Sequence, residues 1–262
     1  MFSTALLTSV LLATSALAVP SRLAERVSRR PGSRMTRPLK HVEAVTHAAT
    51  NVSHVEYSGN WAGAVYDSYP ANSFTAVTGT FTVPKPSAGT GSGGSYSASA
   101  WVGIDGDTCN TAILQTGVDF TVSNGKVSYD AWYEWYPDSA HDFTGISFSA
   151  GDIVTVTVTA SSTTSGTAVI ENKSTGQRVT QDLNSTSALC EENAEWIVED
   201  FDEEGGQVPF ANFGTVTFTN ASATTSSGVV GPGPATIIDI QQHNRVLTDV
   251  NVDNNDVTIK YV

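Results

Sequence analysis

The chain has 262 residues, a formal net charge of −13 and only two cysteines. A chain this acidic argues against a nucleic-acid partner, because phosphates require a basic footprint. No cluster of His and Cys has the spacing of a zinc site, and the Asp-Gly-Asp sequence at residues 105–107 lacks the further ligands of a calcium loop. We therefore expect no metal and no other cofactor.

The first 18 residues have the features of a secretory signal peptide. An apolar run over residues 5–13 is too short to span a membrane, and it is followed by the small-residue cleavage pattern Ala16-Leu17-Ala18. No later apolar run is long enough for a transmembrane helix. The expected product is secreted and extracellular, with no membrane partner.

Residues 19–54 are interpreted as a basic prosegment. They carry seven Lys and Arg against two Glu, whereas residues 55–262 carry six Lys and Arg against 24 Asp and Glu. Opposite charges would hold this segment on the acidic part of the chain as an intramolecular inhibitor, and a disordered basic tail is the alternative. Acid would protonate the carboxylates and release the segment. This predicts self-activation in acid, with a mature start within residues 51–57.

Residues 55–262 are long enough for one domain with a substantial core, and their pattern is that of β-strands. Short runs rich in Val, Ile, Thr and aromatic residues alternate with Gly, Asn, Asp and Ser. Strands are predicted, in chain order, at residues 77–83, 101–105, 112–119, 129–136, 146–149, 153–160, 167–171, 178–183, 194–200, 215–219, 235–241 and 257–262. About a dozen antiparallel strands predict a two-sheet β-sandwich. Nothing in the sequence suggests more than a monomer.

Four of these segments offer one apolar face and one mixed face. Side chains two residues apart in a strand share a face, so Gln115 lies beside Ile113, and Glu199 lies beside Ile197 and Glu195. The mixed faces carry carboxylate, amide and indole groups from Trp101, Asp105, Gln115, Trp132, Glu134 and Glu199. Acidic groups beside large aromatic residues indicate a binding groove. Glu195 is expected to perturb Glu199 rather than to act as a catalyst.

Carboxylates are the groups left for acid–base chemistry. Only His141 and His243 remain after residue 54, neither lies in a nucleophile motif, and no Gly-x-Ser-x-Gly sequence occurs. Cys109 and Cys190 are expected to pair in a secreted chain, and their disulfide would close a loop of roughly 80 residues, worth on the order of 4 kcal/mol.

Several Asn-x-Ser/Thr sequons follow the secretion prediction. Three of them lie in Ser/Thr-rich turns and are glycosylation candidates, namely Asn172, Asn184 and Asn220.

Several stretches together resemble the eqolisins, the glutamic peptidases of filamentous fungi. They are residues 60–63, 101–109, 111–117, 129–137, 193–200 and 208–213. The likeness covers essentially all of residues 57–262, and the motifs are long and in the right order. The resemblance implies a sandwich of two curved antiparallel sheets, concanavalin- or jelly-roll-like, with a substrate groove on its concave side. It also implies a preproenzyme that acts at acidic pH without a metal.

The resemblance further implies a catalytic dyad of Gln115 and Glu199. Glu199 would take a proton from a water lying between the two side chains, and the Gln115 amide would stabilise the oxyanion. Since an amide carries no charge to raise the pKa of its partner, Glu199 is expected to stay ionised at low pH.

Other positions match the eqolisin groove, with Asp105 expected to orient a dyad member through a hydrogen bond. They are Trp101, Asp105, Trp132 and Glu134, with Trp61 and Asp119 as further candidates.

The leading hypothesis is a secreted acid endopeptidase that acts on protein and peptide substrates and is insensitive to pepstatin. One alternative is a carbohydrate-active enzyme that uses Glu134 and Glu199 as a carboxylate pair. The other is a lectin-like module without catalysis, in which Trp101 and Trp132 stack on sugar. A glycosidase would tolerate loss of Gln115, and a lectin would tolerate loss of both dyad residues.

Overall fold

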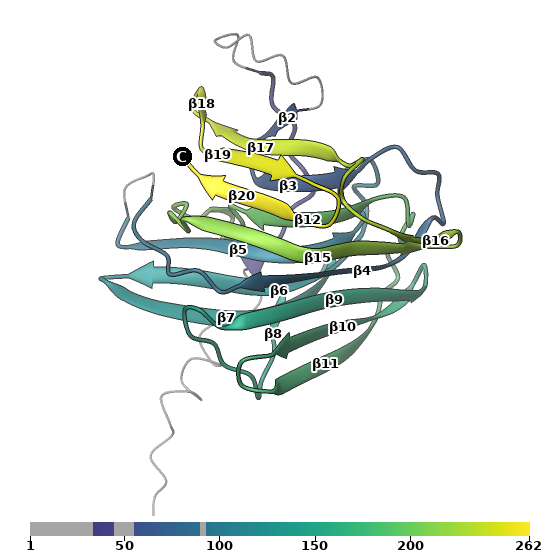
Figure 1. Ribbon diagram of the computed structural model, residues 1–262, viewed down its shortest axis with the longest axis horizontal. Helices are drawn as coiled ribbons and strands as arrows, with labels where there is room; N and C mark the ends of the chain where they lie inside the picture. Colours follow the sequence, from purple (N-terminus) through teal and green to yellow (C-terminus); the bar gives the residue numbers. More distant parts are fainter. Residues whose placement is uncertain (1–33, 45–54, 90–92) are drawn as a thin grey trace, which may run out of the picture. The chain divides into compact units, whose positions relative to one another are not determined.

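A computed structural model of the chain describes residues 34–44, 55–89 and 93–262. In these residues the chain forms strands and loops without a helix, and two main sheets form a β-sandwich (Figure 1). The predicted all-β sandwich is therefore confirmed. Nowhere in this part of the chain is there a helix long and apolar enough to cross a membrane. The signal-peptide prediction and most of the predicted prosegment fall outside the described residues.

The first sheet has eight strands in the order β11-β10-β9-β4-β15-β20-β19, with β16 paired to β15. These strands are β4 (Phe74–Thr82), β9 (Ile153–Ser162), β10 (Ser165–Asn172), β11 (Gln177–Asn184), β15 (Thr215–Thr225), β16 (Gly228–Val230), β19 (Thr248–Val252) and β20 (Val257–Tyr261).

The second sheet has nine strands in the order β18-β17-β3-β12-β5-β6-β7-β8, with β2 paired to β17. These strands are β2 (Val55–Ser58), β3 (Trp61–Tyr66), β5 (Ser95–Ile104), β6 (Ile113–Ser123), β7 (Lys126–Tyr136), β8 (His141–Asp142), β12 (Ala194–Glu199), β17 (Thr236–Gln242) and β18 (Arg245–Val246). The β2–β17 pair is parallel, and the other pairs of this sheet are antiparallel.

A small third sheet joins the predicted prosegment to the domain. Its order is β1-β13-β14, with β1 (Arg34–Met35), β13 (Asp202–Glu203) and β14 (Gly206–Gln207). β1 is antiparallel to β13, so a piece of residues 19–54 is hydrogen-bonded to a hairpin that comes directly after β12.

Alternation along β12 divides the second sheet into a core face and an outer face. Trp196 and Val198 belong to the main hydrophobic core between the sheets. Ile197 belongs to a second apolar cluster with three tryptophans, Trp61, Trp101 and Trp132. This is the division that the two-residue period predicts, and it assigns the predicted groove residues to the outer face.

One predicted strand is wrong. Residues 146–149 join no ladder, although Ile146 and Phe148 pack against the main core. Their spacing produces the alternation of a strand, but the carbonyl of Ser147 accepts a hydrogen bond from the side chain of Asn172. A period-2 pattern reports which side chains are buried and does not report whether the backbone has a partner strand.

Candidate active site

Four neighbouring strands of the second sheet carry the predicted site residues in three rows. From β12 through β5 and β6 to β7, the rows are Glu195-Gly103-Gln115-Glu134, Ile197-Trp101-Gly117-Trp132 and Glu199-Ser99-Asp119-Asp130. Residues directly opposite each other in paired strands point to the same side of a sheet. Gln115 and Glu199 therefore share the outer face, which also carries Trp61, the residue opposite Glu199 on β3.

Glu199 is fully buried and held at both carboxyl oxygens. The indole Nε1 of Trp101 donates a hydrogen bond to Oε2 at 3.1 Å. The amide N–H of Arg37 and the side-chain amide of Asn60 approach Oε1 at 3.3 and 3.5 Å. Burial raises the pKa of Glu199 to about 8, and the positive charge of Arg34 opposes that rise. With residues 34–44 in place, Glu199 therefore does not keep the low pKa expected from the sequence, because burial alone raises the pKa without a second carboxylate.

Gln115 is also fully buried, and it differs from Glu199 in its contacts. Neither its Oε1 nor its Nε2 has a hydrogen-bond partner within the described residues. Burying an amide without a hydrogen-bond partner lowers the stability of the fold by about 1–3 kcal/mol for each polar group. Such groups are few in native proteins and each requires an explanation, of which a catalytic role is one.

Residues 34–44, which we call the docked segment, lie across this face. Arg34 is almost fully buried against it, with 3% of its surface exposed. Its guanidinium binds Asp119 through two nitrogens at 2.8 and 2.9 Å and Glu134 at 3.3 Å. It lies 3.7 Å from the ring centroid of Trp132 and 4.6 Å from that of Phe201. This pocket accepts a planar cation by bidentate pairing and ring stacking.

Electrostatics couple Arg34 to the carboxyl groups of the face. Burial on its own lowers the pKa of Arg34, but Asp119 and Glu134 outweigh it and the net shift is upward. Burial raises the pKa of Glu134 well above its usual value, and Arg34 and the N–H of Thr36 oppose that rise. The docked segment thus supplies the positive charge that keeps these buried carboxylates paired.

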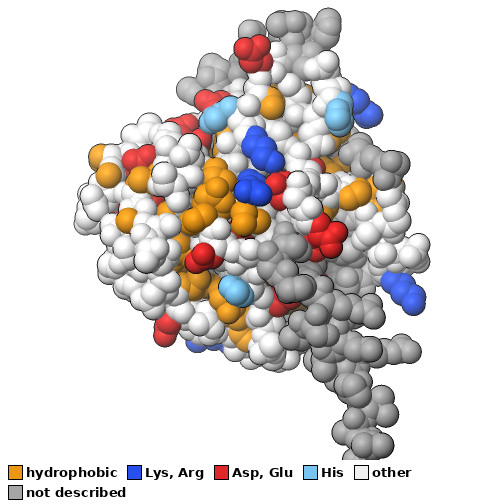
Figure 2. Space-filling model, turned by 180° about the vertical axis from the view of Figure 1, so that it is seen from behind, with side chains coloured by type: hydrophobic (Ala, Val, Ile, Leu, Met, Phe, Trp, Pro, Cys, Tyr) orange, Lys and Arg blue, Asp and Glu red, His pale blue; other side chains and the backbone are white. Residues whose placement is uncertain are grey.

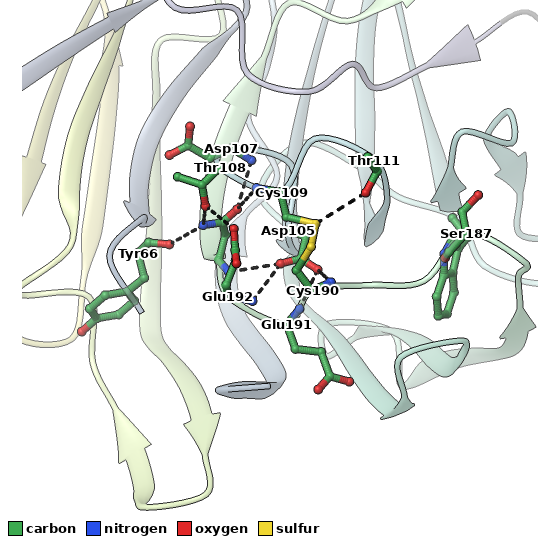
Figure 3. Close-up of a disulfide and its surroundings, with 12 residues drawn as sticks. Tyr66, Asp105, Asp107, Thr108, Cys109, Thr111, Ser187, Cys190, Glu191 and Glu192 are labelled. Atoms are coloured by element: carbon green, nitrogen blue, oxygen red, sulfur yellow. Dashed lines mark hydrogen bonds between the residues drawn. A yellow bond between two sulfur atoms is a disulfide. The ribbon is translucent and has the colours of Figure 1, made fainter. Parts of the chain in front are cut away.

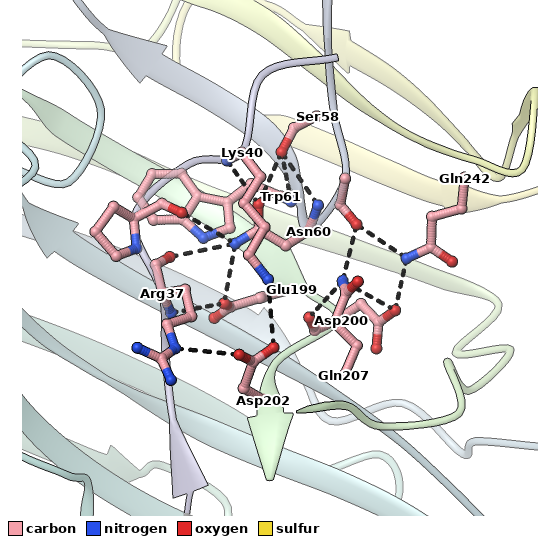
Figure 4. Close-up of polar contacts among 12 residues, drawn as sticks. Arg37, Lys40, Ser58, Asn60, Trp61, Glu199, Asp200, Asp202, Gln207 and Gln242 are labelled. Carbon is pink, nitrogen blue, oxygen red and sulfur yellow. Dashed lines mark hydrogen bonds and ion pairs between the residues drawn. The ribbon is translucent and has the colours of Figure 1, made fainter. Parts of the chain in front are cut away.

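The rest of the docked segment makes more exposed contacts (Figure 4). Arg37 and Lys40 both pair with Asp202, at 3.1 and 3.4 Å. The side-chain amide of Asn60 donates to the carbonyls of Arg37 and Pro38 at 3.2 and 3.3 Å. On the side of the molecule opposite to the view of Figure 1, basic side chains lie among hydrophobic and acidic ones (Figure 2). The contacts therefore agree with the charge complementarity predicted from the sequence.

Asp105 lies at the disulfide and not between the dyad residues (Figure 3). Cys109 and Cys190 are bonded, which confirms the predicted bridge. The buried carboxylate of Asp105 accepts four backbone N–H groups from residues 190–193, at 2.7 to 3.2 Å. Asp105 itself has a φ of 70°, a left-handed conformation that is unfavourable for most residues. These contacts tie the loop before β12 to the end of β5.

The three glycosylation candidates differ in exposure. Asn184 and Asn220 are exposed. Asn172 is fully buried, and its amide nitrogen donates to the carbonyl of Ser147 and to Asp152, both at 2.9 Å. The side-chain nitrogen of Asn172, which would carry the sugar, is therefore enclosed in the folded protein, whereas those of Asn184 and Asn220 lie on exposed residues.

Several groove residues were not predicted from the sequence. Phe201 stacks on Arg34 and Ser99 hydrogen-bonds both Arg34 and Trp132, whereas Asp202 pairs with basic residues of the docked segment. Ser99 had a usable signal, since it shares a face with Trp101 by the two-residue period. Phe201 and Asp202 lie beyond the end of β12, where no periodicity applies.

A β-sandwich whose outer sheet face holds a buried glutamate and a buried glutamine beneath an extended segment fits a glutamic peptidase. The family model described as "Peptidase A4 family" matches residues 59–261, and the chain belongs to this family, the eqolisins. The chain is therefore a hydrolase of peptide bonds, as the resemblance implied. This family assignment excludes the carbohydrate-active and lectin-like alternatives.

Two curated relatives and one solved structure extend this finding. Aspergillopepsin-2 of Aspergillus niger is 49% identical over 100% of this chain and 99% of its own length. Scytalidopepsin B of Scytalidium lignicola is 42% identical over 81% of each chain. The crystal structure of scytalido-glutamic peptidase with a transition state analog inhibitor has a TM-score of 0.71 at 43% identity, and the match covers 78% of this chain and 98% of that one.

Proposed function

We propose that the chain is a secreted acid endopeptidase in which Gln115 and Glu199 form the catalytic dyad. The observation that carries this proposal is the path of the docked segment across the face that bears both residues. The chain's own backbone comes into contact with the carboxyl group there, with the N–H of Arg37 3.3 Å from Oε1 of Glu199. A face that binds one extended peptide in this way is suited to peptide substrates.

In this mechanism Glu199 carries out two proton transfers. As a carboxylate it takes a proton from a water, whose oxygen bonds to the scissile carbonyl carbon while the carbonyl electrons move onto oxygen. The N–H of Gln115 donates a hydrogen bond to that oxyanion and cannot titrate. Glu199 then gives its proton to the leaving nitrogen as the C–N bond breaks, which restores the carboxylate. The hydrogen bond from Trp101 keeps the carboxyl group oriented throughout.

The docked segment inhibits the enzyme because it contacts Glu199 without presenting a peptide carbonyl to Gln115. The N–H of Arg37 binds Oε1 of Glu199, the atom that would otherwise accept the proton of the water. The carbonyls of Arg37 and Pro38 accept hydrogen bonds from Asn60, so they are held at Asn60 and not at Gln115. The segment therefore binds in the groove without presenting either carbonyl to the proposed oxyanion donor.

Release of the docked segment in acid would also restore the base. The pKa of Glu199 is about 8 with the segment in place, and burial is the largest cause. Removing the segment would take away Arg34 and the N–H of Arg37, which lower the pKa, but it would also admit water and weaken the desolvation that is the largest cause of the rise. Burial raises the pKa of Glu134 well above its usual value, so acid protonates Glu134 and weakens its ion pair with Arg34. The condition that loosens the docked segment is therefore also the one in which the enzyme is proposed to work. This fits a secreted zymogen.

The test compares wild type with Gln115→Ala and Glu199→Gln on an unfolded protein at acidic pH, with the products mapped by mass spectrometry. Wild type should cut with or without pepstatin. Loss of an oxyanion donor should lower kcat by about 100- to 1,000-fold, and loss of the general base by about 10,000-fold. Glu171→Gln, which removes a carboxyl group from β10 of the first sheet, is the matched control. Full activity of Gln115→Ala would refute the dyad.

A further inference from the structure

Glu195 is a buried acid that the dyad mechanism does not use. It lies on β12 with none of its surface exposed, and neither carboxyl oxygen has a hydrogen-bond partner in the described part of the chain. The free-energy cost of such a group is large unless it is neutral or paired. A simple structural role would be served better by an apolar side chain of similar size, so the carboxyl group requires an explanation.

The register of the sheet places Glu195 opposite Gln115 with only a glycine between them. Glu195 pairs with Gly103 on β5, and Gly103 pairs with Gln115 on β6. A methyl group on Gly103 would lie 2.6 Å from Oε1 of Glu195 and 3.4 Å from Cβ of Gln115. The carboxyl group therefore extends over Gly103 toward Gln115, and the ring of Trp101, whose Cζ3 would lie 2.9 Å from the same methyl group, borders this space.

The two groups are chemically complementary, and both are unpartnered. Burial, together with the charges of Asp105 and Asp107, raises the pKa of Glu195 well above its usual value, so the side chain carries a proton in acid. A protonated carboxyl group has one O–H to donate and one carbonyl to accept with. The amide of Gln115 has an acceptor and two N–H donors, neither end of which is bonded within the described residues.

The two side chains make no direct hydrogen bond with each other. We propose that Glu195 is a positioning residue whose O–H is linked through one bridging water to Oε1 of Gln115, and that this link turns Nε2–H toward the groove. An amide can rotate by half a turn and present oxygen where nitrogen is needed. Only the orientation with N–H toward the groove stabilises an oxyanion. The acid behind Gln115 fixes that orientation, and Gly103 is the residue that leaves room for it.

This inference rests on the proposed role of Gln115, and the experiment separates the two. The kinetics of acid-activated wild type, Glu195→Leu, Glu195→Gln and Gln115→Ala would be compared, together with the double variant Glu195→Leu/Gln115→Ala. Glu195→Leu should lower kcat by about 10-fold or more with KM nearly unchanged, because a donor that acts in the transition state is misoriented. Glu195→Gln keeps an N–H donor at the same place and should restore most of kcat.

The double variant gives the decisive comparison. If Glu195 acts through Gln115, Glu195→Leu has no further effect once Gln115 is Ala. Thermal unfolding checks that Glu195→Leu folds, and Glu195→Met serves the same kinetic comparison if the Leu variant does not fold. An unchanged kcat in Glu195→Leu, or an equal loss in both backgrounds, would overturn this inference alone. An active Gln115→Ala would overturn the dyad as well.

Discussion

Two neighbouring regions near the C-terminal end of β5 treat buried polar groups in opposite ways. After its last residue, the carboxylate of Asp105 accepts four backbone N–H groups beside the disulfide. Along its outer face, Gln115, Glu195 and one oxygen of Glu134 have no hydrogen-bond partner among the described residues. Both regions are buried, so burial alone does not decide whether a polar group is paired.

The two regions therefore serve different purposes. Paired polar groups fix a loop in one conformation and stabilise the fold. Unpaired ones destabilise the fold and have their hydrogen-bonding capacity available for another molecule. Substitutions beside the disulfide should change stability, and substitutions in the groove should change chemistry.

Glu199→Gln is expected to have the largest effect. It removes the proposed base from the groove and should reduce kcat by about 10,000-fold, equivalent to about 5 kcal/mol in the activation free energy. The free energy of unfolding should stay the same or rise, because a buried acid is replaced by an amide. Peptide hydrolysis in acid and urea unfolding of the same preparation measure the two quantities. A parallel loss of stability would show that the groove, like the disulfide region, supports the fold.

Asp105→Ala should have the opposite effect, a loss of stability with little change in activity. It leaves four backbone N–H groups without their acceptor, which should lower the free energy of unfolding by about 4 kcal/mol. Activity per folded molecule should change by less than about 3-fold, since none of the contacts of Asp105 reaches Gln115 or Glu199. Urea unfolding measures the first effect, and Asp105→Asn, which keeps one oxygen, should lose about half as much. A folded Asp105→Ala protein with kcat strongly reduced would instead support the role predicted from the sequence.

Arg34→Ala tests the charge that pairs the groove carboxylates while the docked segment is bound. It leaves Asp119 and Glu134 buried without their cation, which should weaken binding of the segment by about 3 kcal/mol. Arg37→Ala is the matched control. Arg37 pairs with Asp202 at a partly exposed site, so this ion pair should contribute less than about 1 kcal/mol to binding of the segment. The measurement is the pH at which the full-length chain loses residues 34–44 on acidification. Equal shifts for the two variants would show that the Arg34 pocket does not anchor the segment.

The pH dependence of stability should show the smallest effect. Burial raises the pKa of Asp239 to about 6, of Asp200 to about 7 and of Glu199 to about 8. A carboxyl group with a raised folded-state pKa binds its proton more tightly in the folded protein. Its stabilising contribution is therefore complete below the unfolded-state pKa of about 4 and is lost as pH rises through the folded-state value.

We therefore expect the full-length chain to be most stable in acid and to lose stability between about pH 4 and pH 8, by up to about 1.4 kcal/mol per pH unit for each group that ionises. Urea unfolding at a series of pH values measures this slope. Asp239→Asn should remove its share of the slope without affecting the groove. A stability maximum at neutral pH would contradict the assignment of these raised pKa values.

The sequence predicted on which face of the sheet a side chain lies better than it predicted which residues lie beside that side chain. The face of Gln115 or Glu199 depends on the two-residue period of one strand, and the structure agrees with both assignments. Which residues lie opposite depends on register, which no single strand encodes. The sequence therefore suggested that Glu195 perturbs Glu199, four residues away on the same strand, whereas the register places Glu195 opposite Gly103 and in the same row as Gln115.

The contacts of Asp105 and Arg34 could not be predicted from the sequence, for a related reason. The partners of Asp105 are backbone N–H groups of residues 190–193, and any residue type supplies an N–H group. Charge predicted that a basic segment would bind an acidic domain, but it did not single out Arg34 among seven basic residues. That choice depends on a pocket built from three segments distant in sequence, around Asp119, Glu134 and Phe201.

If the docked segment leaves as proposed, the small three-stranded sheet changes as well as the face that carries Glu199. β1 covers one side of β13, and its loss uncovers the main-chain donors and acceptors of Asp202 and Glu203. A free strand edge is a template that pairs with any extended polypeptide, whatever side chains that polypeptide carries. The hairpin that follows β12 would then have a free edge, to which the backbone of an extended peptide could pair.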